Sequence, residues 1–428
     1  MVGAAEPAPQ TPAAERHDPY AALRHRPFRL FIISLLAMTA ASQVQEVVVA
    51  WQIYARTKDP LSLGLVGLAE AVPFISVAMY AGHVADRVDR RKLAVAALAA
   101  LAACAVALLA IAVPFDRGRF EAVWPLYAVI FLTGIARSFL QPARTALTSQ
   151  LVPRALYASA TTWRSSTWQT AAVAGPALGG LLYAVGGATL AYAVVVLLML
   201  AALATMTMVP SPGRVAAPAE GEGEGESMRD SLVGGLRFVV RQPVVLGAIT
   251  LDLFAVLFGG ATALLPLFAD SILHVGPQGL GVLRAAPAAG AVLMSLVLAH
   301  RPPFRRAGVA LLWNVAAFGL CMIGFGLSRN FALSVGLLAL SGMVDNVSVV
   351  IRGTLIQVMT PAHLLGRVSA VNSIFIGSSN EIGAFESGVA AKLLGAVRAV
   401  VLGGIATLGV VGVIAWKLPE VRRLGQIR

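Results

Sequence analysis

The chain has 428 residues, of which 58% are hydrophobic and 13% are charged. Its mean hydropathy is +0.79, whereas an average soluble domain is about 45–50% apolar and about 25% charged. A water-soluble globular fold could not cover this much apolar surface, so the composition excludes that class. It predicts an all-α membrane protein instead, because lipid leaves backbone polar groups no partner outside a helix or a closed barrel.

Twelve long apolar stretches follow one another along the chain. A helix of about 20 apolar residues crosses a hydrocarbon core of about 30 Å, so each stretch predicts a transmembrane helix. The predicted spans are 28–54, 62–85, 93–114, 122–145, 162–185, 188–209, 243–269, 278–299, 307–327, 331–352, 367–391 and 398–416. The third, sixth, ninth and twelfth carry no charge in their interior, which predicts that they face lipid while the other eight face water or one another.

A polar segment divides the twelve helices into two groups of six. It contains the acidic run EGEGEGE at 220–226, followed by SMRDSLVGGLRFVVRQP, which predicts a short amphipathic helix on the membrane surface. The predicted parts are a disordered cytoplasmic tail at 1–22, a six-helix bundle at 23–210, a cytoplasmic linker at 211–242, a second six-helix bundle at 243–418 and a cytoplasmic tail at 419–428.

The net charge of +12 reflects membrane topology. With the N-terminus inside, 23 of the 33 Lys and Arg residues fall on the cytoplasmic side, seven on the outer side and three within helices. This bias predicts that both termini are cytoplasmic, and no nucleic-acid partner is expected. Cys104 and Cys321 lie in the middle of predicted helices without metal-ligand spacing, so neither a disulfide nor a metal site is expected.

The two groups of helices are similar in sequence. A shift of 208 residues aligns 132–191 with 340–399 without a gap, and twelve of the 60 positions are identical, among them Gly180 with Gly388. A shift of 214 places Gly67 on Gly281. Such parallel repeats predict a substrate site between the halves near the middle of the bilayer.

Polar residues within the predicted helices are the candidates for this site, because a charge at a helix centre in lipid costs at least about 2.5–3.5 kcal/mol. The internal alignment places Arg137 opposite Asp345 and Glu70 opposite Arg284, while Arg352 is near enough to the inner surface to reach it. The alternative that such residues only tie helices together stays open. The cavity candidates are Gln45, Gln52, Arg137, Gln141, Arg284, Ser341, Asn346 and Ser348, and the proton-coupling candidates, in order, are Asp345, Asp252, Glu46 and Glu70.

Three segments resemble a known family. The loop after the second span resembles the G-x3-D-R-x2-R-R signature of the major facilitator superfamily through Gly82, Asp86, Arg87, Arg90 and Arg91. The fifth span resembles the core of the motif of antiporters in that superfamily through Gly175, Pro176, Gly179 and Gly180, although Ala171 and Thr162 replace its upstream glycines. The segment VSAVNSIFIGSSNEIGAFESG at 368–388 is similar to the enterobactin-exporter branch. His300 stands where the loop signature's aspartate would recur, so the second loop is degenerate.

The resemblance implies a monomeric secondary transporter in the bacterial inner membrane. It implies export of a small amphipathic or aromatic compound, such as a siderophore or a drug, by proton antiport and alternating access, with helices one, four, seven and ten lining the cavity. The partners would be this substrate, protons and lipid, with no cofactor. An importer or uniporter of the same fold, acting on an organic anion or nutrient, remains the alternative. An enzyme or a sensor is not favoured, because the six histidines are unspaced for metal, no phosphate-binding loop occurs, and no loop is long enough to fold alone.

Overall fold

The computed structural model describes residues 18, 20–116, 122–148, 150–211, 228–302, 304–361 and 364–425. Within these ranges the regular elements are all helices. Ten of the helices described are long and apolar enough to cross a membrane. The expected all-α membrane fold is therefore present, and most predicted spans coincide with a helix to within a few residues.

The N-terminal group of helices ends in one long, broken element. Its members are α1 (Ala21–Arg24), α2 (Arg26–Thr57), α3 (Pro60–Arg87), α4 (Arg90–Asp116), α5 (Trp124–Thr148), the short η1 (Arg154–Leu156) and α6 (Tyr157–Thr207). Gly186 and Gly187 are non-helical, and Gly187 has a φ of +67° that favours glycine. The Asp116 carboxylate accepts hydrogen bonds from the backbone N–H and the hydroxyl of Thr189, at 2.8 and 2.7 Å. The break at Gly186–Gly187 therefore coincides with the predicted boundary between the fifth and sixth spans.

The C-terminal group begins with the amphipathic helix expected in the linker. Its members are α7 (Met228–Arg241), α8 (Pro243–Gly259), η2 (Ala261–Leu264), α9 (Leu265–Leu267), η3 (Phe268–Ile272), α10 (Gly276–Ala299), α11 (Ala307–Leu327), α12 (Phe331–Met359), α13 (Leu365–Leu394), α14 (Ala396–Lys417) and α15 (Pro419–Arg423). The predicted seventh span is interrupted after Gly259, because Gly260 leaves the helical conformation (φ −74°, ψ 64°). The charged helix α13 is not among the ten apolar spans.

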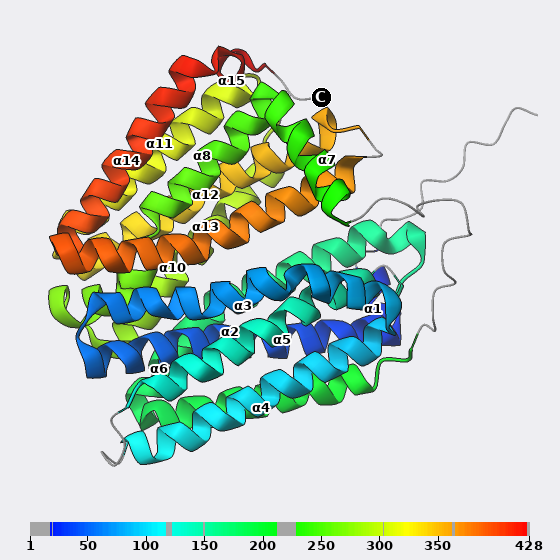
Figure 1. Cartoon of the computed structure of the whole chain (residues 1–428), viewed down its shortest axis with the longest axis vertical. Helices are drawn as coiled ribbons and strands as arrows, with labels where there is room; N and C mark the ends of the chain where they lie inside the picture. The colour runs from blue at the N-terminus through cyan, green and yellow to red at the C-terminus, as the bar shows by residue number, and fades with distance from the viewer. Residues whose placement is uncertain are drawn as a thin grey trace, which may run out of the picture.

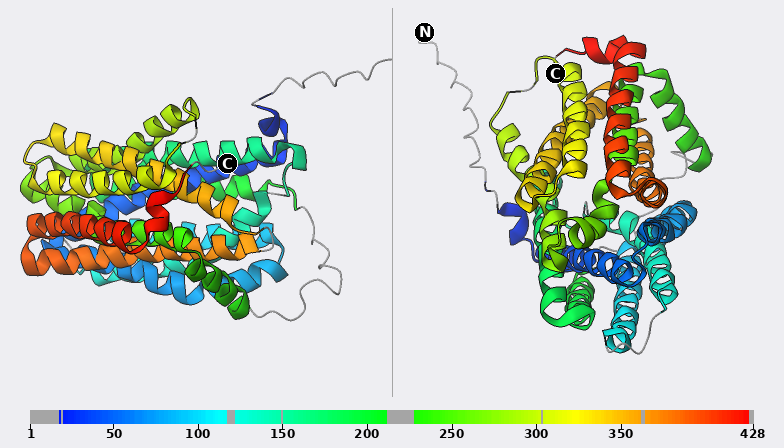
Figure 2. Two further views of the ribbon diagram at one scale, coloured as in Figure 1. Left: turned by 90° about the horizontal axis from the view of Figure 1, so that it is seen from above. Right: turned by 90° about the vertical axis from the view of Figure 1, so that its left-hand side faces the viewer.

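The two groups lie one on the other, with the N-terminal helices below and the C-terminal helices above (Figure 1). The right-hand view of Figure 2, from the left-hand side of Figure 1, again shows the C-terminal helices above the N-terminal ones. The extensive contacts between them run along α3 with α13 and along α6 with α10. These four helices therefore hold the halves together.

Both contacts contain a crossing at which two glycines meet. A side-chain carbon on Gly180 of α6 would lie 2.9 Å from the Cα of Gly281 in α10, and one on Gly388 of α13 would lie 2.7 Å from the Cα of Gly64 in α3. Small residues allow helix backbones to approach this closely within a membrane. Gly180 and Gly388 are equivalent in the internal alignment, so the repeat produces a matched pair of crossings.

The structure describes helices at both predicted tails. Ala21 and Ala22 belong to α1, so the tail expected at 1–22 is helical at its end, while residues 1–17 and the acidic run at 220–226 lie outside the described residues. The tail expected from residue 419 begins with α15, whose Val421 is 1% exposed. A side-chain carbon on Gly308 of α11 would overlap the backbone oxygen of Val421. Close packing against α11 therefore anchors this segment.

Candidate functional site

A cavity of about 300 Å³ lies between the two groups of helices. Residues from both groups line it, on α2, α3, α5, α6, η2, α10 and α13. The charged residues among them are Glu46, Glu70, Arg137, Arg284 and Glu381, and the large apolar ones are Val49, Leu63, Val66, Ile130 and Met199. Polar and apolar residues contribute comparable shares of this lining. A cavity that combines apolar contacts with convergent polar groups suits a small molecule that has both kinds of surface.

A second cavity of about 210 Å³ adjoins the first on the N-terminal side. The two share Ser42, Glu46 and Arg137. Gln141 lines the second cavity and accepts a hydrogen bond of 2.7 Å from the Arg144 guanidinium. The charged cluster therefore lies where the two cavities meet.

Ion pairs connect the charged residues of the larger cavity. Arg137 contacts Glu70, and its Nη1 lies 3.6 Å from a Glu46 oxygen. Arg284 contacts the other Glu46 oxygen at 2.8 Å. One carboxylate on α2 thus bridges guanidiniums from the two halves. The expected opposition of Arg137 to Asp345 is not present, and Glu46 rather than Glu70 pairs with Arg284.

Local packing explains why Arg137 reaches Glu70. A side-chain carbon on Gly134 would lie 2.8 Å from the Glu70 backbone oxygen, so α5 lies directly against α3 at this point. Arg137 follows Gly134 by three residues and therefore projects from the same face of α5. The glycine brings the helices close enough for the guanidinium to contact Glu70.

Several predicted residues line the larger cavity, namely Gln45, Glu46, Glu70, Arg137 and Arg284. Gln52 does not, because it is fully buried and its side-chain oxygen accepts a hydrogen bond of 3.0 Å from the Tyr192 hydroxyl. That bond ties α2 to the second segment of α6. Gln52 therefore has a contact between helices in place of the expected cavity position.

The tenth predicted helix, which was expected to line the substrate cavity, contributes no lining residue to the two cavities described above. A side-chain carbon on Gly342 of α12 would lie 1.9 Å from the backbone oxygen of Pro287, so α12 packs tightly against α10. The Ser341 hydroxyl donates to the Leu338 carbonyl of its own helix at 2.7 Å, and Asn346 accepts a hydrogen bond of 3.2 Å from Ser295 of α10. Neither cavity is lined by Ser341, Asp345, Asn346 or Ser348.

Asp252 is engaged in a buried ion pair with Arg352. Their exposed fractions are 6% and 4%, so Arg352 does not reach the membrane surface as expected. The pair joins α8 to α12 within the C-terminal half. It places Asp252 in a contact that ties helices together, the alternative that the sequence left open.

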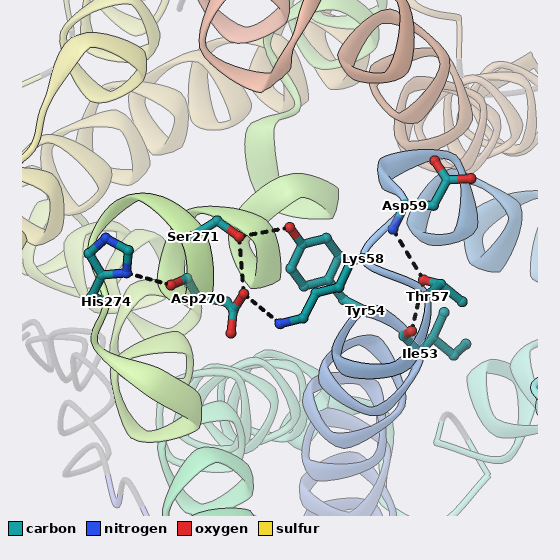
Figure 3. Close-up of polar contacts among 8 residues, drawn as sticks. All are labelled: Ile53, Tyr54, Thr57, Lys58, Asp59, Asp270, Ser271 and His274. Atoms are coloured by element: carbon teal, nitrogen blue, oxygen red, sulfur yellow. Dashed lines mark hydrogen bonds and ion pairs between the residues drawn. The ribbon is translucent and has the colours of Figure 1, made fainter. Parts of the chain in front are cut away.

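Polar contacts join the halves where α2 ends and α3 begins (Figure 3). The Tyr54 and Ser271 hydroxyls share a hydrogen bond of 2.9 Å, and the Lys58 ammonium donates to Asp270 at 2.7 Å. Lys392 of α13 donates to Asp59 at 2.9 Å. We call these six residues the closed end. The hydrogen bond from Lys392 holds the pKa of Asp59 below its usual range, aided by the backbone N–H of Leu61.

The loop motif joins α3 to α4 at the end of α3 that lies opposite the closed end. Of its predicted residues, Gly82 lies within the C-terminal part of α3, Arg87 ends α3 and Arg90 begins α4. Arg91 donates to the Thr207 carbonyl at the end of α6. The side chain of Asp86 lies outside the described part of the structure.

Asp89 within this loop was missed by the sequence analysis. It accepts hydrogen bonds from the backbone N–H groups of Arg91 and Lys92, at 2.9 and 3.2 Å, and so caps α4. The Ser211 hydroxyl, 2.5 Å away, contributes most to holding the pKa of Asp89 below its usual range. An aspartate directly before a helix is a recognised start signal and could have identified it.

The glycines of the fifth-span motif pack α6 against two neighbours. A side-chain carbon on Gly175 would lie 2.5 Å from the Cβ of Gln43, and one on Gly179 would lie 3.1 Å from the Val44 backbone oxygen, both on α2. Pro176 and Gly180 face α10 instead, where a carbon on Gly281 would lie 2.6 Å from the Pro176 oxygen. The motif therefore provides close packing within and between the halves.

Glu381 of α13 is a charged cavity residue that the sequence analysis missed. It lies in the segment 368–388 that was singled out for its family resemblance. A carboxylate inside a predicted membrane span is itself a signal for function, and this signal could have identified it.

The fold and the charged cavity together define a multi-pass membrane protein with an internal site shared by two halves. A family model described as a transmembrane secretion effector, of the major facilitator superfamily, matches residues 17–427, and the chain therefore belongs to this family. The protein is a transporter, and it is a multi-pass protein of the bacterial inner membrane.

Curated relatives and solved structures agree with this assignment. The chain is 26% identical over 407 residues to a protein of Shigella boydii serotype 18 named enterobactin exporter EntS, and 27% identical to one of that name from Escherichia coli O1:K1, with 94% of each chain covered. A POT family transporter in complex with 5-aminolevulinic acid matches with a TM-score of 0.71 at 11% identity, covering 92% of this chain and 96% of that one. A bacterial homologue of the lysosomal transporter Spinster, inward-facing and occupied, matches with a TM-score of 0.70 at 13% identity, covering 95% and 99%. These structures share the fold.

Proposed function

We propose that the protein exports a small amphipathic or aromatic compound across the inner membrane by proton antiport and alternating access. The observation that carries this proposal is the cavity between the halves, which combines an apolar wall with ionisable residues. Similarity to proteins named enterobactin exporters supports export, with a siderophore or a drug as the substrate class. We further propose that the protein acts as a monomer.

The proposed topology has twelve crossings with both termini in the cytoplasm. The two segments of α6 count as two crossings, since an unbroken helix of its 51 residues would be about 77 Å long. The segment from α8 to η3 is one crossing, and α13 is another. The helices α1, α7 and α15 lie toward the end opposite the closed end (Figure 1). In this topology the closed end faces the periplasm, and the cavity is reached from the cytoplasm.

Proton coupling is assigned to carboxylates of the cavity or to Asp345. Glu46 and Glu70 line the cavity between the halves, where a change of charge would act on both. Asp252 is the weaker candidate, because Arg352 neutralises it. Asp345 remains a candidate, since no ion pair engages it among the described residues.

The test uses inside-out membrane vesicles whose interior is acidified by respiration. A catecholate siderophore and a panel of hydrophobic drugs are added in turn, and the pH gradient is followed with a fluorescent amine. We expect one compound to dissipate the gradient in vesicles that contain the protein and to accumulate inside them. Glu70→Gln and Asp345→Asn then show which carboxylate is required. Accumulation of substrate by intact cells, with no proton movement in the vesicles, would support the importer or uniporter instead.

A further inference from the structure

The charges of the larger cavity do not balance. Three carboxylates, Glu46, Glu70 and Glu381, face two guanidiniums, Arg137 and Arg284. Glu70 and Glu46 engage Arg137, and Glu46 also engages Arg284. In the part of the chain that the structure describes, Glu381 has neither an ion pair nor a hydrogen bond from its carboxylate. The fully ionised lining of the larger cavity therefore carries one negative charge in excess, located at Glu381. Arg144 lines only the adjoining cavity and is not among the charges that act on Glu381.

Glu381 is placed directly between the halves. A side-chain carbon on Gly67 of α3 would lie 3.4 Å from the Glu381 Oε2, so the carboxylate rests against α3 at a point one helical turn from Glu70. The charges around it are those of Glu70, Glu46, Arg137 and Arg284, from α3, α2, α5 and α10. The nearby η2 contributes the uncharged Thr262 and Ala263 to the lining. Two of the four surrounding charges are negative and two are positive, so they do not neutralise the extra carboxylate.

We propose that Glu381 holds a monovalent cation in this cavity, either a proton or the cationic group of an amphipathic substrate. The proposal rests on the proposed transport function and specifies the charge of its ligand. An anionic substrate would add a second uncompensated negative charge where both guanidiniums are already engaged, and like charges repel strongly in a site of low dielectric. An organic cation removes the excess charge, while Val49, Val66 and Ile130 can contact its apolar body. A proton on Glu381 gives the same charge balance, so the two occupants compete.

Two ions of the same shape and opposite charge test this assignment. Binding of tetraphenylphosphonium and of tetraphenylborate to the purified protein in detergent is measured between pH 6 and pH 9. We expect wild type to bind the cation and not the borate, with binding that weakens as the pH falls and protons compete. In weakly buffered solution, binding of the cation should release protons if Glu381 is protonated beforehand. An ionised Glu381 would release none.

Glu386 on the same helix provides the matched control, because it lines neither cavity. Glu381→Gln should weaken binding of the cation by about tenfold or more, since one partner of a close charge pair is removed, and should abolish proton release. Glu386→Gln should bind as wild type does. Glu381→Asp keeps the charge and should restore part of the affinity. Gel-filtration profiles and thermal transitions of all variants establish that a loss of binding is not a loss of folding.

Equal binding of the cation by wild type and Glu381→Gln overturns the proposal, as does tighter binding of the borate or no binding of the cation by folded wild type. The vesicle assay separates this failure from failure of the transport function. If Glu381-dependent binding occurs without transport driven by a pH gradient, the proposed antiport is wrong and the cation site stands. If a gradient drives transport of anions alone, antiport stands and the cation site is wrong.

Discussion

Glu46 shows how a single residue can connect the two halves of this transporter. Its two carboxylate oxygens face guanidiniums that project from α5 and α10, one in each half. The sequence predicted Glu46, Glu70, Arg137 and Arg284 as site residues because charge within lipid is costly, and the structure brings all four together. The sequence could not predict which of these residues form ion pairs with one another. The internal alignment relates equivalent positions of the two repeats, whereas the ion pairs form between positions that are not equivalent.

The buried pair of Asp252 and Arg352 makes a prediction at this scale. Arg352→Met should destabilise the protein by about 3–5 kcal/mol, because Asp252 would remain as an uncompensated buried charge. The double variant with Asp252→Asn should recover much of the loss. Thermal unfolding of the purified variants measures both effects, with exposed Lys417→Met as the control. Equal stability of Arg352→Met and wild type would contradict a structural role for the pair.

Asp59 makes a prediction about pH. Its pKa in the folded protein is depressed by the hydrogen bond from Lys392, so its contribution to stability is present above the unfolded pKa of about 3.9. That contribution is lost as the pH falls through the folded pKa. Wild type should therefore exceed Asp59→Asn in thermal stability at neutral pH, by less than about 1 kcal/mol for so exposed a pair. The two curves should converge below about pH 4, and a constant difference down to pH 2 would contradict this account.

At the scale of elements, apolar length and charge identified the helices better than they identified their interruptions. The break of α6 coincides with a predicted boundary because Gly186 and Gly187 end the periodic pattern. The interruption at Gly260 was not predicted, since the flanking residues are as apolar as a continuous span. The position of α12 was also not predictable, because the tight contact of Gly342 with Pro287 is a property of tertiary packing.

The glycine crossings provide the prediction for elements. Gly180→Ala should destabilise the protein by about 1–3 kcal/mol, because the new carbon would lie 2.4 Å from the Pro277 oxygen and force α6 and α10 apart. Gly353→Ala on α12 is the matched control, since its added carbon meets nothing within 4 Å. That change should be neutral or stabilising by about 0.5–1 kcal/mol, the usual advantage of alanine over glycine within a helix. Thermal unfolding compares the two, and equal effects would refute the packing argument.

For the whole molecule, the closed end predicts that transport requires its separation. After Cys104 and Cys321 are replaced by alanine, cysteines at Lys58 and Asp270 can be joined by a short bifunctional maleimide, because their side chains are in contact. We expect cross-linking to abolish transport in vesicles while leaving ligand binding to purified protein intact. A single cysteine at position 58, treated in the same way, should transport normally. Full transport by the cross-linked protein would show that the closed end does not move.

The arrangement of the helices in two similar groups could be predicted from the sequence, because matching glycines occur in both groups. Which helices meet was not accessible. The contacts of α3 with α13 and of α6 with α10 depend on how the halves dock, and no periodicity within one helix encodes that.

The two glycine crossings have a mechanical consequence for the closed end. Where Gly180 meets Gly281 and Gly64 meets Gly388, backbone lies against backbone, and no side chain of these residues is inserted between the helices. Because these glycines have no side chains to interdigitate, the helices can separate at the crossings without a change of rotamer there. The polar contacts of Tyr54, Lys58 and Asp59 can then exchange their partners for water as the surfaces part. The polar contacts therefore stabilise the closed end, while the glycine crossings add little to the barrier for its opening.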